Sequence, residues 1–344
     1  MRDFDLLVVG SGPAGQHAAL QAASMGKRVG IIERKPNIGG AGLQTGTIPS
    51  KALREVAYMA SQVGRRGMRE AFSAEAKPQH GILTEAVHRK ETVIAKQESV
   101  ILGQLLEYGV SLIPGEASFV DEHTLEIRSQ THEPRRIRAG VIILATGSRP
   151  RRPSDIPFDK ETVLDSTSIL KIKHLPRSMV VVGGGVIACE FITIFAALGV
   201  EVSVVDSHAQ ILDYLNKDVV TVLTDSMQSM GVSFHMNSRC VAVRKEAGQV
   251  STLLDGGEKL YSDTVLYAQG REPNFASLHI ANAGIDAVDG WIAVNDFYQT
   301  SVPHIYAVGD LIGRPALAST AMEQGRLAVE YAFESSEPVM AKNM

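Results

Sequence analysis

A glycine-rich turn of the form Gly-x-Gly-x-x-Gly occurs twice in this chain, with Ala at the last position of the second copy. One copy runs from Gly10 to Gly15 and the other from Gly183 to Ala188, and each stands between an apolar strand pattern and a helix pattern. The first glycine permits a tight turn, and the second lets the backbone approach a pyrophosphate. The third position lets helix and strand pack closely. This context predicts two dinucleotide-binding βαβ units.

An acidic residue ends the strand pattern that follows each turn, Glu33 in the first unit and Asp206 in the second. A carboxylate there accepts hydrogen bonds from a ribose, while the phosphates meet the positive end of the helix dipole. Two dinucleotides facing each other imply hydride transfer, so the pattern favours an oxidoreductase.

Composition excludes several other classes of protein. The net charge is −4, from 34 Lys+Arg and 38 Asp+Glu with no long run of either sign, so we expect neither nucleic acid nor a membrane as partner. No apolar run approaches the length of a membrane span, and the first residues carry acids where a signal peptide is basic, which predicts a cytoplasmic protein. The two cysteines and the scattered histidines show no metal-ligand spacing, so we expect no metal.

The length of 344 residues exceeds what one hydrophobic core usually organises, so we expect two domains. Strand patterns at residues 5–9 and 28–33 flank a helix pattern at 13–26, and amphipathic helical patterns follow from Ser50 to about Tyr108. A run that contains Pro150, Pro153 and Pro157 marks the boundary before the second unit, which begins at Met179. The predicted fold is α/β, with the second unit inserted between two parts of the first.

Five further motifs have the order found in one known family. They are GTIPSKAL (Gly46–Leu53), LATGSRP (Leu144–Pro150), DSTSIL (Asp165–Leu170), YAQGREPN (Tyr267–Asn274) and TSVPHIYAVGD (Thr300–Asp310). With the glycine turns, they make the chain resemble, over nearly its whole length, the flavoprotein family of glutathione reductase and dihydrolipoamide dehydrogenase. Three segments are most similar to the transhydrogenase branch of that family: Phe119–Ile127, Tyr298–Gly313 and Leu317–Arg326.

The resemblance implies two nested, three-layer Rossmann-like domains. FAD would bind to residues 1–150 plus 275–344, and NAD(H) or NADP(H) would bind to residues 151–274 as a substrate. Family members continue into a C-terminal interface domain beyond the position of Met344. We therefore expect that domain to be absent, which puts the family's homodimer in doubt.

The motifs and the resemblance together imply a set of cofactor-binding residues. The glycines of the first turn would hold the FAD pyrophosphate, Glu33 the adenosine ribose and Asp310 the ribityl chain. The full set is Gly10, Gly12, Pro13, Ala14, Gly15, Glu33, Arg34, Gly40, Thr47, Lys51, Ala117, Ala145, Thr146, Gly147, Gly183, Gly185, Val186, Ile187, Glu190, Asp206, Gly270, Arg271, Gly309, Asp310 and Ala318.

Lys51 and Glu190 are the predicted catalytic residues. In the family the matching lysine lies beside flavin N5 and the matching glutamate pairs with it, which would stabilise the reduced ring and align the nicotinamide. Without the family pattern, Lys51 reads as an ordinary helix-surface cation. Glu190 then reads as an acid favoured by the helix dipole.

Gly42 and Thr47 occupy the two positions where disulfide reductases of this family carry redox cysteines. Neither side chain forms a disulfide, so exchange with lipoamide or glutathione disulfide is excluded at this site. The resemblance indicates that the transhydrogenase branch keeps the first cysteine, so Gly42 departs further. Cys189 and Cys240 are interpreted as small buried hydrophobic residues.

Asp206 favours NADH, since its carboxylate accepts hydrogen bonds from a ribose diol and repels a 2′-phosphate. His208 would favour phosphate when it is protonated, although an exposed turn histidine is the simpler interpretation. The function that we expect is FAD-dependent transhydrogenation between NAD(H) and NADP(H). The alternatives are an NADH-dependent diaphorase or flavin reductase acting on a quinone, dye or oxygen, and a non-catalytic nucleotide-binding remnant.

Overall fold

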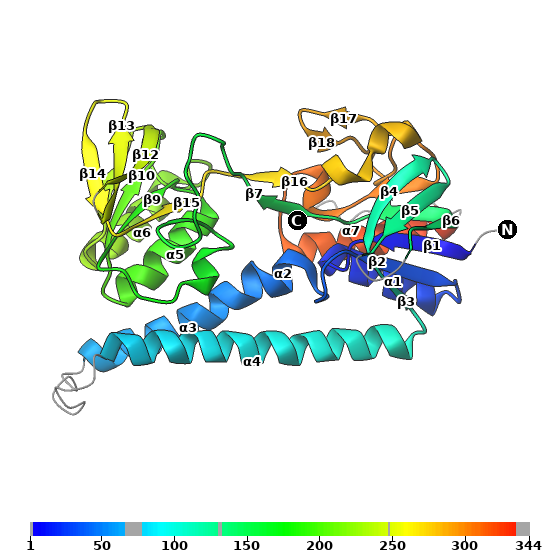
Figure 1. The fold of residues 1–344 in the computed structure, drawn as a ribbon, viewed down its shortest axis with the longest axis horizontal. Coiled ribbons are helices and arrows are strands. Elements are labelled where there is room, and N and C mark those ends of the chain that lie inside the picture. Colours follow the sequence, from blue (N-terminus) through cyan, green and yellow to red (C-terminus); the bar gives the residue numbers. More distant parts are fainter. Residues whose placement is uncertain (1–2, 66–77, 130–132, 247, 335–344) are drawn as a thin grey trace. The chain divides into compact units, whose positions relative to one another are not determined.

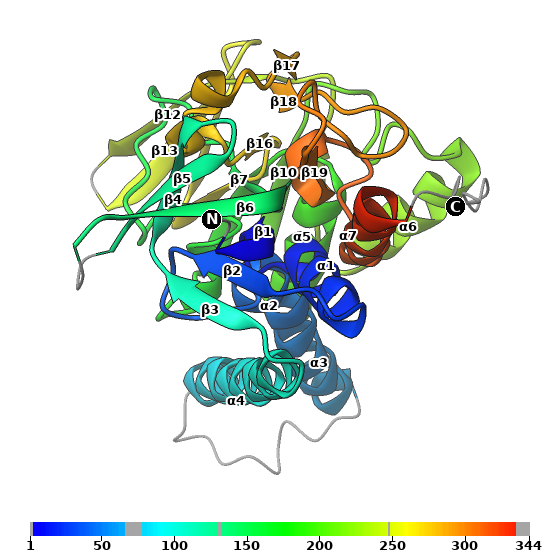
Figure 2. The ribbon, with the colours of Figure 1, turned by 90° about the vertical axis from the view of Figure 1, so that its right-hand side faces the viewer.

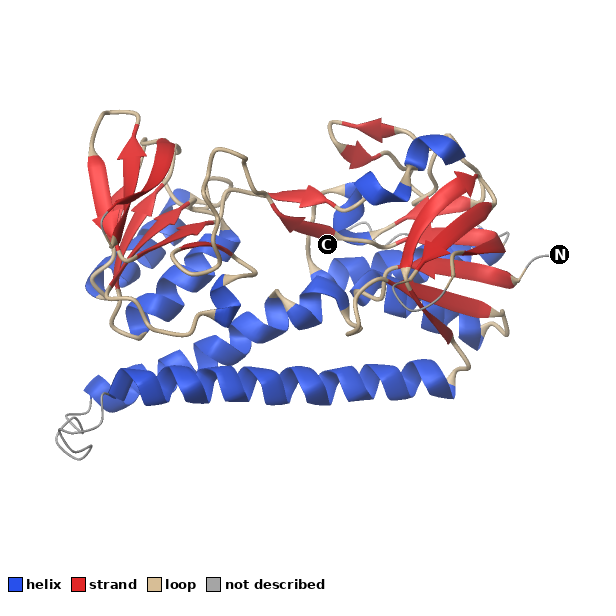
Figure 3. Cartoon of the chain, viewed as in Figure 1, coloured by secondary structure: helices blue, strands red, loops and turns tan. Residues whose placement is uncertain are grey.

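The computed structural model describes residues 3–65, 78–129, 133–246 and 248–334. Contacts divide the chain into two units. Unit 1 contains residues 1–47, 94–149 and 272–344, and unit 2 contains residues 48–93 and 150–271. Each unit carries a parallel sheet with helices on one face, so the predicted α/β, Rossmann-like fold is confirmed (Figures 1 and 3).

The parallel sheet of unit 1 has the strand order β3-β2-β1-β6-β19. Its strands are β1 (Phe4–Val9), β2 (Val29–Glu33), β3 (Ser111–Pro114), β6 (Arg135–Leu144) and β19 (Ile305–Ala307). The first half of β6 pairs antiparallel with β5 (Thr124–Arg128), which pairs with β4 (Glu116–Asp121). One long strand therefore serves both the Rossmann-like sheet and an antiparallel extension.

Alternation of side chains along β1 separates the two faces of this sheet. Leu6 and Val8 pack on the face that carries α1 (Pro13–Ser24) and α7 (Ala318–Phe333), whereas Leu7 and Val9 join the core beneath β4 and β5. All four side chains are buried, and full burial of each contributes about 1.5–3 kcal/mol. Helices α1 and α7 lie side by side (Figure 2). The result is the predicted three-layer arrangement.

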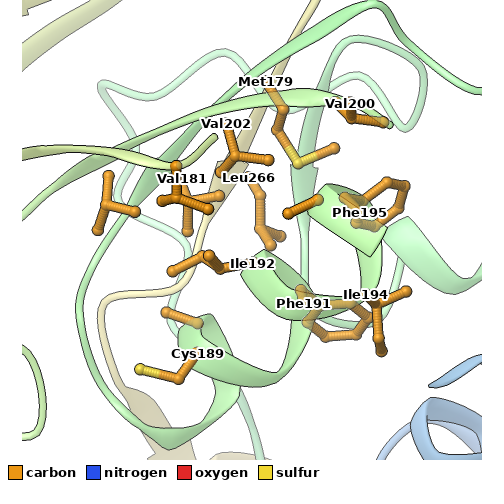
Figure 4. Close-up of a cluster of buried hydrophobic side chains, with 14 of the residues drawn as sticks. Met179, Val181, Cys189, Phe191, Ile192, Ile194, Phe195, Val200, Val202 and Leu266 are labelled. Atoms are coloured by element: carbon orange, nitrogen blue, oxygen red, sulfur yellow. The ribbon is translucent and has the colours of Figure 1, made fainter. Parts of the chain in front are cut away.

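Unit 2 repeats this plan. Its parallel sheet has the order β11-β10-β9-β15-β8. The strands are β8 (Val163–Asp165), β9 (Ser178–Val182), β10 (Glu201–Val205), β11 (Ser233–His235) and β15 (Thr264–Tyr267). On one face α5 (Val186–Ala197) and α6 (Lys217–Ser229) cover a core in which Met179, Val181 and Val202 meet Phe191 and Ile192 (Figure 4). On the other face lies a three-stranded antiparallel sheet, β12 (Cys240–Glu246), β13 (Gln249–Leu254) and β14 (Lys259–Ser262).

The helices before β3 are divided between the two units. Helix α2 (Gly40–Gln44) lies in unit 1, while most of α3 (Thr47–Arg65) and the first half of α4 (Pro78–Glu107) belong to unit 2. Leu53, Ala57 and Ala86 pack into the same core as α5, which explains this membership. Residues 48–93 therefore cluster with unit 2, whereas the expected first domain, residues 1–150, contains them. The amphipathic stretch predicted from Ser50 to Tyr108 includes residues 66–77, which lie outside the described residues, as do positions 335–344 of the expected first domain.

Short elements complete the described structure. Strands β7 (Ser148–Pro150) and β16 (Arg271–Pro273) pair where the chain passes between the units, and β17 (Ala287–Val288) pairs with β18 (Trp291–Ile292). The 3₁₀ turns are η2 (Ile169–Lys171), η3 (Ala276–Leu278), η4 (Ile280–Ala283) and η5 (Gly309–Ile312).

Candidate nucleotide-binding sites

Backbone crowding at the first glycine turn leaves no room for a side chain at Gly10, Gly15 or the neighbouring Gly40. A Cβ atom on Gly10, whose φ is +108°, would lie 2.5 Å from the backbone oxygen of Ala145, and one on Gly15 would lie 2.0 Å from the oxygen of Gly10. Gly40, with φ at +59°, packs its backbone onto Gly12, since a Cβ there would lie 2.6 Å from the Gly12 Cα. The end of β1, the start of α1 and the start of α2 therefore meet at a bare backbone surface.

The N-terminus of α1 faces this surface without a side-chain cap. Gly12 is the N-cap residue in extended conformation, Pro13 is the first helical residue, and no acidic side chain lies in the first turn. The first amide groups of a helix have no partner within the helix and carry the positive end of its dipole. This arrangement suits a phosphate.

Glu33 at the end of β2 is tied to the glycine turn through Ser11. One carboxylate oxygen, Oε2, accepts from the Ser11 amide at 3.0 Å and from the Ser11 hydroxyl at 2.6 Å, and Oε1 accepts from the Lys35 amide at 2.9 Å. Ser11 is fully buried, and its Oγ also accepts from the Gly39 amide. The sequence reasoning missed Ser11, although its place between the first two glycines was a usable signal.

Residues from the C-terminal part of unit 1 complete this region. Asp310 accepts a hydrogen bond from the Ser148 hydroxyl at 2.6 Å, and the amide of Gly309 donates to the side chain of buried Gln324 at 2.8 Å. Gly309 packs against Ala14 of α1, so η5 lies beside the first helix. Asp310 is thus placed in the same unit and near the same helix as the glycine turn.

Two buried polar atoms of unit 1 have no hydrogen-bond partner, the hydroxyl of Thr146 and the side-chain oxygen of Asn274. Asn274 nevertheless holds the loop after β6, because its side-chain nitrogen donates to Thr146 O at 3.2 Å and its amide donates to Gly147 O at 2.9 Å. An unsatisfied buried hydroxyl costs about 1–3 kcal/mol, which a bound polar ligand would remove. Asn274 was part of a recognised motif but was absent from the predicted site residues.

The second glycine turn has the same backbone geometry. A Cβ atom on Gly183, whose φ is +118°, would lie 2.8 Å from the backbone oxygen of Ala268. Gly185 is the extended N-cap residue of α5, with no side-chain cap and no acid in the first turn. A Cβ on Gly185 would meet nothing within 4 Å, and Val186 beside it is 59% exposed. This helix terminus is therefore open, as a pyrophosphate site requires.

Asp206 occupies the place in unit 2 that Glu33 has in unit 1. Its Oδ2 accepts from the Gly184 amide at 2.5 Å, and its Oδ1 accepts from the His208 amide at 2.8 Å. In both units the acid lies 22 residues beyond the turn residue whose amide it binds. The His208 ring adds a contact of 2.6 Å between Nδ1 and Oδ1, and this contact raises the pKa of the imidazole.

Lys51 and Glu190, the predicted catalytic pair, are brought together within unit 2. The Lys51 ammonium of α3 pairs with Glu190 Oε2 of α5. The Lys51 side chain is 54% exposed, whereas Glu190 is 15% exposed and its Oε1 is buried without a hydrogen-bond partner. The predicted pair of Lys51 and Glu190 is therefore formed, and Oε1 of Glu190 can accept a hydrogen bond from another donor.

Among the described residues, no reactive thiol lies beside either glycine turn. Gly42 packs beside α1, where a Cβ would lie 3.1 Å from Pro13 Cγ, and Thr47 begins α3. The two cysteines of the chain, Cys189 and Cys240, are free, and burial raises their pKa to about 12 and about 11 respectively. Cys189 lies in the apolar cluster under α5 (Figure 4). Neither is a thiolate near neutral pH.

The other predicted residues lie in varied surroundings. Arg34 pairs with Glu116 at 3.3 Å, and Ala117 is buried in the core between β4 and the sheet. Ala145 follows β6, and its amide donates a hydrogen bond to Val9 O of β1. Ala318 begins α7, whose N-terminus also lacks a side-chain cap. In unit 2, Ile187 is half-buried on α5, and Gly270 and Arg271 lie at the end of the inserted segment.

Two observations limit other kinds of site. Within the described ranges, no three His, Cys, Asp or Glu side chains are grouped so that they could hold a metal ion. None of the described helices combines the length and the hydropathy needed to cross a membrane.

The geometry of both glycine turns fits a dinucleotide. Each presents an uncapped helix N-terminus, a backbone surface that side chains would block, and a carboxylate fixed beside the turn. Unit 1 adds the orphaned Thr146 hydroxyl next to Gly10, whose added Cβ would lie 3.2 Å from the Thr146 amide.

Known proteins are similar to this chain in fold and in sequence. A family model described as pyridine nucleotide-disulphide oxidoreductase matches residues 4–325. Soluble pyridine nucleotide transhydrogenases from Mycobacterium tuberculosis and Colwellia psychrerythraea are 43% and 38% identical, and in both cases the match covers 97% of this chain and 71% of the relative.

Solved structures give the same picture. LpdA from Mycobacterium tuberculosis matches with a TM-score of 0.88 and 30% identity, over 97% of this chain and 74% of that one. The HOCl-induced flavoprotein disulfide reductase RclA from Escherichia coli matches with a TM-score of 0.83 and 26% identity, over 97% of this chain and 72% of that one.

Proposed function

This chain belongs to the pyridine nucleotide-disulphide oxidoreductase family, which binds FAD and NAD(P), and we propose that it is an NAD(P)⁺ transhydrogenase that works without a redox disulfide. FAD would occupy the glycine turn of unit 1 and the nicotinamide nucleotides that of unit 2. When bound, FAD supplies a ring that accepts a hydride from one nicotinamide nucleotide and gives it to another. The relatives named soluble pyridine nucleotide transhydrogenase support this assignment.

The observation that carries the proposal is a pair of matching glycine turns in a chain whose two cysteines are not thiolates near neutral pH. Glu33 with Ser11 and Asp206 with Gly184 form matching acid–turn pairs. Gly42 stands where a disulfide reductase needs a sulfur atom. Hydride transfer between a nicotinamide nucleotide and FAD uses both sites and no thiol, whereas reduction of a disulfide in this family also uses a pair of redox cysteines.

The residues of this chain would bind and orient the reactants. The amides at the starts of α1 and α5 would hold the two pyrophosphates, and Glu33 and Asp206 would accept hydrogen bonds from ribose hydroxyls. Lys51 would stabilise negative charge on the reduced ring system, and the partnerless Oε1 of Glu190 would accept from the carboxamide of a nicotinamide.

Steady-state kinetics with NADPH as donor and thio-NAD⁺ as acceptor test the proposal. We expect reduction of thio-NAD⁺ that requires FAD, with the parallel double-reciprocal plots of a ping-pong mechanism. A purified protein that takes up FAD and is reduced, but never reduces thio-NAD⁺, would contradict it. A colourless protein that binds no FAD would support the remnant alternative.

Asp206 specifically favours a second candidate, an NADH-dependent diaphorase. The backbone amides of Gly184 and His208 hold the carboxylate in place, and its negative charge suits a ribose diol better than a 2′-phosphate. Comparison of a quinone, oxygen and thio-NADP⁺ as acceptors for electrons from NADH distinguishes the two. A diaphorase reduces the quinone at a high rate and thio-NADP⁺ hardly at all.

A further inference from the structure

The carboxylate of Asp206 is nearly saturated by donors of the protein itself. A carboxylate offers about four acceptor positions, two on each oxygen. Gly184 N uses one on Oδ2, while the amide and the ring Nδ1 of His208 use two on Oδ1. One position remains, on Oδ2, whereas a ribose diol donates two hydrogen bonds.

The ring of His208 is the donor that can leave. The Gly184 amide is fixed in the glycine turn, but the His208 side chain is 58% exposed. In unit 1 the matching donor is the hydroxyl of Ser11, which is fully buried and cannot withdraw. Only unit 2 therefore has a movable group on its ribose-binding acid.

Two carboxylates flank this ring. Nδ1 lies 2.6 Å from Asp206 Oδ1 at the end of β10, and Nε2 lies 3.6 Å from Asp213 Oδ2 in the loop before α6. Because both ring nitrogens face carboxylate oxygens, the geometry favours the imidazolium, which donates from both. His235 of β11, whose backbone oxygen accepts from the Asp206 amide, directs its own ring to Glu258.

We propose that His208 sets the choice between NADH and NADPH in unit 2, by competing with the ribose diol for Asp206 and by offering its positive charge to a 2′-phosphate. With the ring in place, Asp206 lacks the second acceptor that NAD(H) needs, and the imidazolium can pair with phosphate. With the ring deprotonated and withdrawn, Asp206 accepts the diol and repels phosphate. The choice of nucleotide thus depends on pH, and NADP(H) is favoured on the acid side. This inference rests on the proposed nicotinamide nucleotide site in unit 2.

The sign of the pH effect follows from the charges. The contact with Asp206 raises the pKa of His208, so the cation persists above the usual histidine range and is lost as pH rises further. Binding of NADP⁺ should therefore weaken with rising pH and binding of NAD⁺ should strengthen.

Equilibrium binding of NAD⁺ and NADP⁺ to the FAD-loaded protein at pH 6.5 and 8.5 provides the test, because oxidised nucleotides bind without reaction. The variants are His208→Ala and His208→Arg, with His88→Ala as a control at another exposed histidine of unit 2. His208→Ala keeps the titration of the 2′-phosphate, whose pKa is near 6, and so isolates the contribution of the ring.

In the parent protein we expect the ratio of the two dissociation constants to shift towards NAD⁺ by roughly three- to tenfold between these pH values, as for a partly exposed charge pair. His208→Ala should reduce this shift to the part that titration of the 2′-phosphate causes, and His208→Arg should bind NADP⁺ tightly at both pH values because its charge is permanent. An equal shift in His208→Ala and the parent protein would overturn the inference alone. Failure of the parent protein to bind either nucleotide would contradict the proposed function as well.

Discussion

Single residues decide which chemistry this chain can perform. Gly42 has no side chain to carry a thiol, Cys189 is buried, and Cys240 is half-buried. Lys51 and Glu190 remain as a charged pair on neighbouring helices of unit 2. The chain thus has the predicted charged pair and lacks the redox thiols of the disulfide reductases in its family.

Replacement of Lys51 by Met should slow reduction of the bound flavin by roughly 10- to 100-fold, the effect of losing one preorganised charge beside a reacting group. Stopped-flow absorbance after mixing with NADH measures this rate. Lys96→Met, the same change at an exposed lysine of α4, is the control and should leave the rate unchanged. Equal rates for the Lys51 variant and the parent protein would remove Lys51 from the mechanism.

Thiol reagents should not inhibit the enzyme at pH 8. Burial raises the pKa of Cys189 to about 12 and that of Cys240 to about 11, so the reactive thiolates form only as pH rises through those values. Activity should survive incubation with iodoacetamide, and a double Cys→Ser variant should retain hydride transfer. Stoichiometric inactivation by the reagent would show that a thiol takes part.

At the scale of elements, close packing of helices places the first glycine turn. Gly325 of α7 lies against α1, where an added Cβ would lie 2.1 Å from the backbone oxygen of Ala14. Asp165 has a comparable role in unit 2, since it binds Arg152 and caps the turn that contains Ser168. These contacts, all between groups of the protein, hold the backbone in place.

Gly325→Ala should destabilise the protein by about 1–3 kcal/mol, because α7 must move away from α1. The control is Gly103→Ala in α4, where an added Cβ meets nothing within 4 Å and the better helix former should be neutral or stabilising. Thermal denaturation and retention of FAD on dilution measure both variants. Equal melting temperatures for the two variants would contradict the packing argument.

Asp165→Asn should lower the stability of unit 2 by about 1–3 kcal/mol at neutral pH, through loss of charged hydrogen bonds. Burial opposes ionisation of Asp165, but the hydrogen bonds from Arg152 and Ser168 outweigh it and lower its pKa. The ionised form therefore stabilises the fold above the unfolded-state pKa of about 4, and this contribution disappears as pH falls below that value.

Urea denaturation between pH 7 and pH 3 measures the difference between Asp165→Asn and the parent protein. The difference should be largest at pH 7 and should close in acid, while Asp155→Asn, at an exposed position of unit 2, should have little effect throughout. A difference that does not change with pH would show that the charge of Asp165 is not what stabilises the loop.

Local elements were predictable from the sequence, whereas contacts between distant elements were not. The predicted helix at residues 13–26 is observed as Pro13–Ser24. It was predictable because the glycine turn before it and the apolar strand patterns on either side are local features of the sequence. The allocation of α3 to unit 2 depends on Leu53 and Ala57 meeting the core of α5, a contact across more than a hundred residues. The Asn274–Thr146 contact, with its two orphaned oxygens, was missed for the same reason.

At the scale of the whole molecule, the chain repeats one architecture. Both units have a five-stranded parallel sheet, an uncapped helix after a glycine turn, and an acid 22 residues beyond the turn. The larger part of unit 2, residues 150–271, is inserted in the sequence between segments of unit 1, and residues 48–93 form its other part. This repetition fits the proposal that unit 1 binds FAD and unit 2 binds the nicotinamide nucleotides.

Anaerobic double-mixing stopped flow tests whether hydride passes through the flavin from one nicotinamide nucleotide to another. The FAD-loaded protein is first reduced with one equivalent of NADPH and then mixed with thio-NAD⁺, while the flavin band and the thio-NADH band are followed together. We expect the flavin band to return at the same rate as thio-NADH appears, in the parent protein and in the double Cys→Ser variant alike. Flavin that stays reduced until oxygen or a quinone is admitted would contradict it.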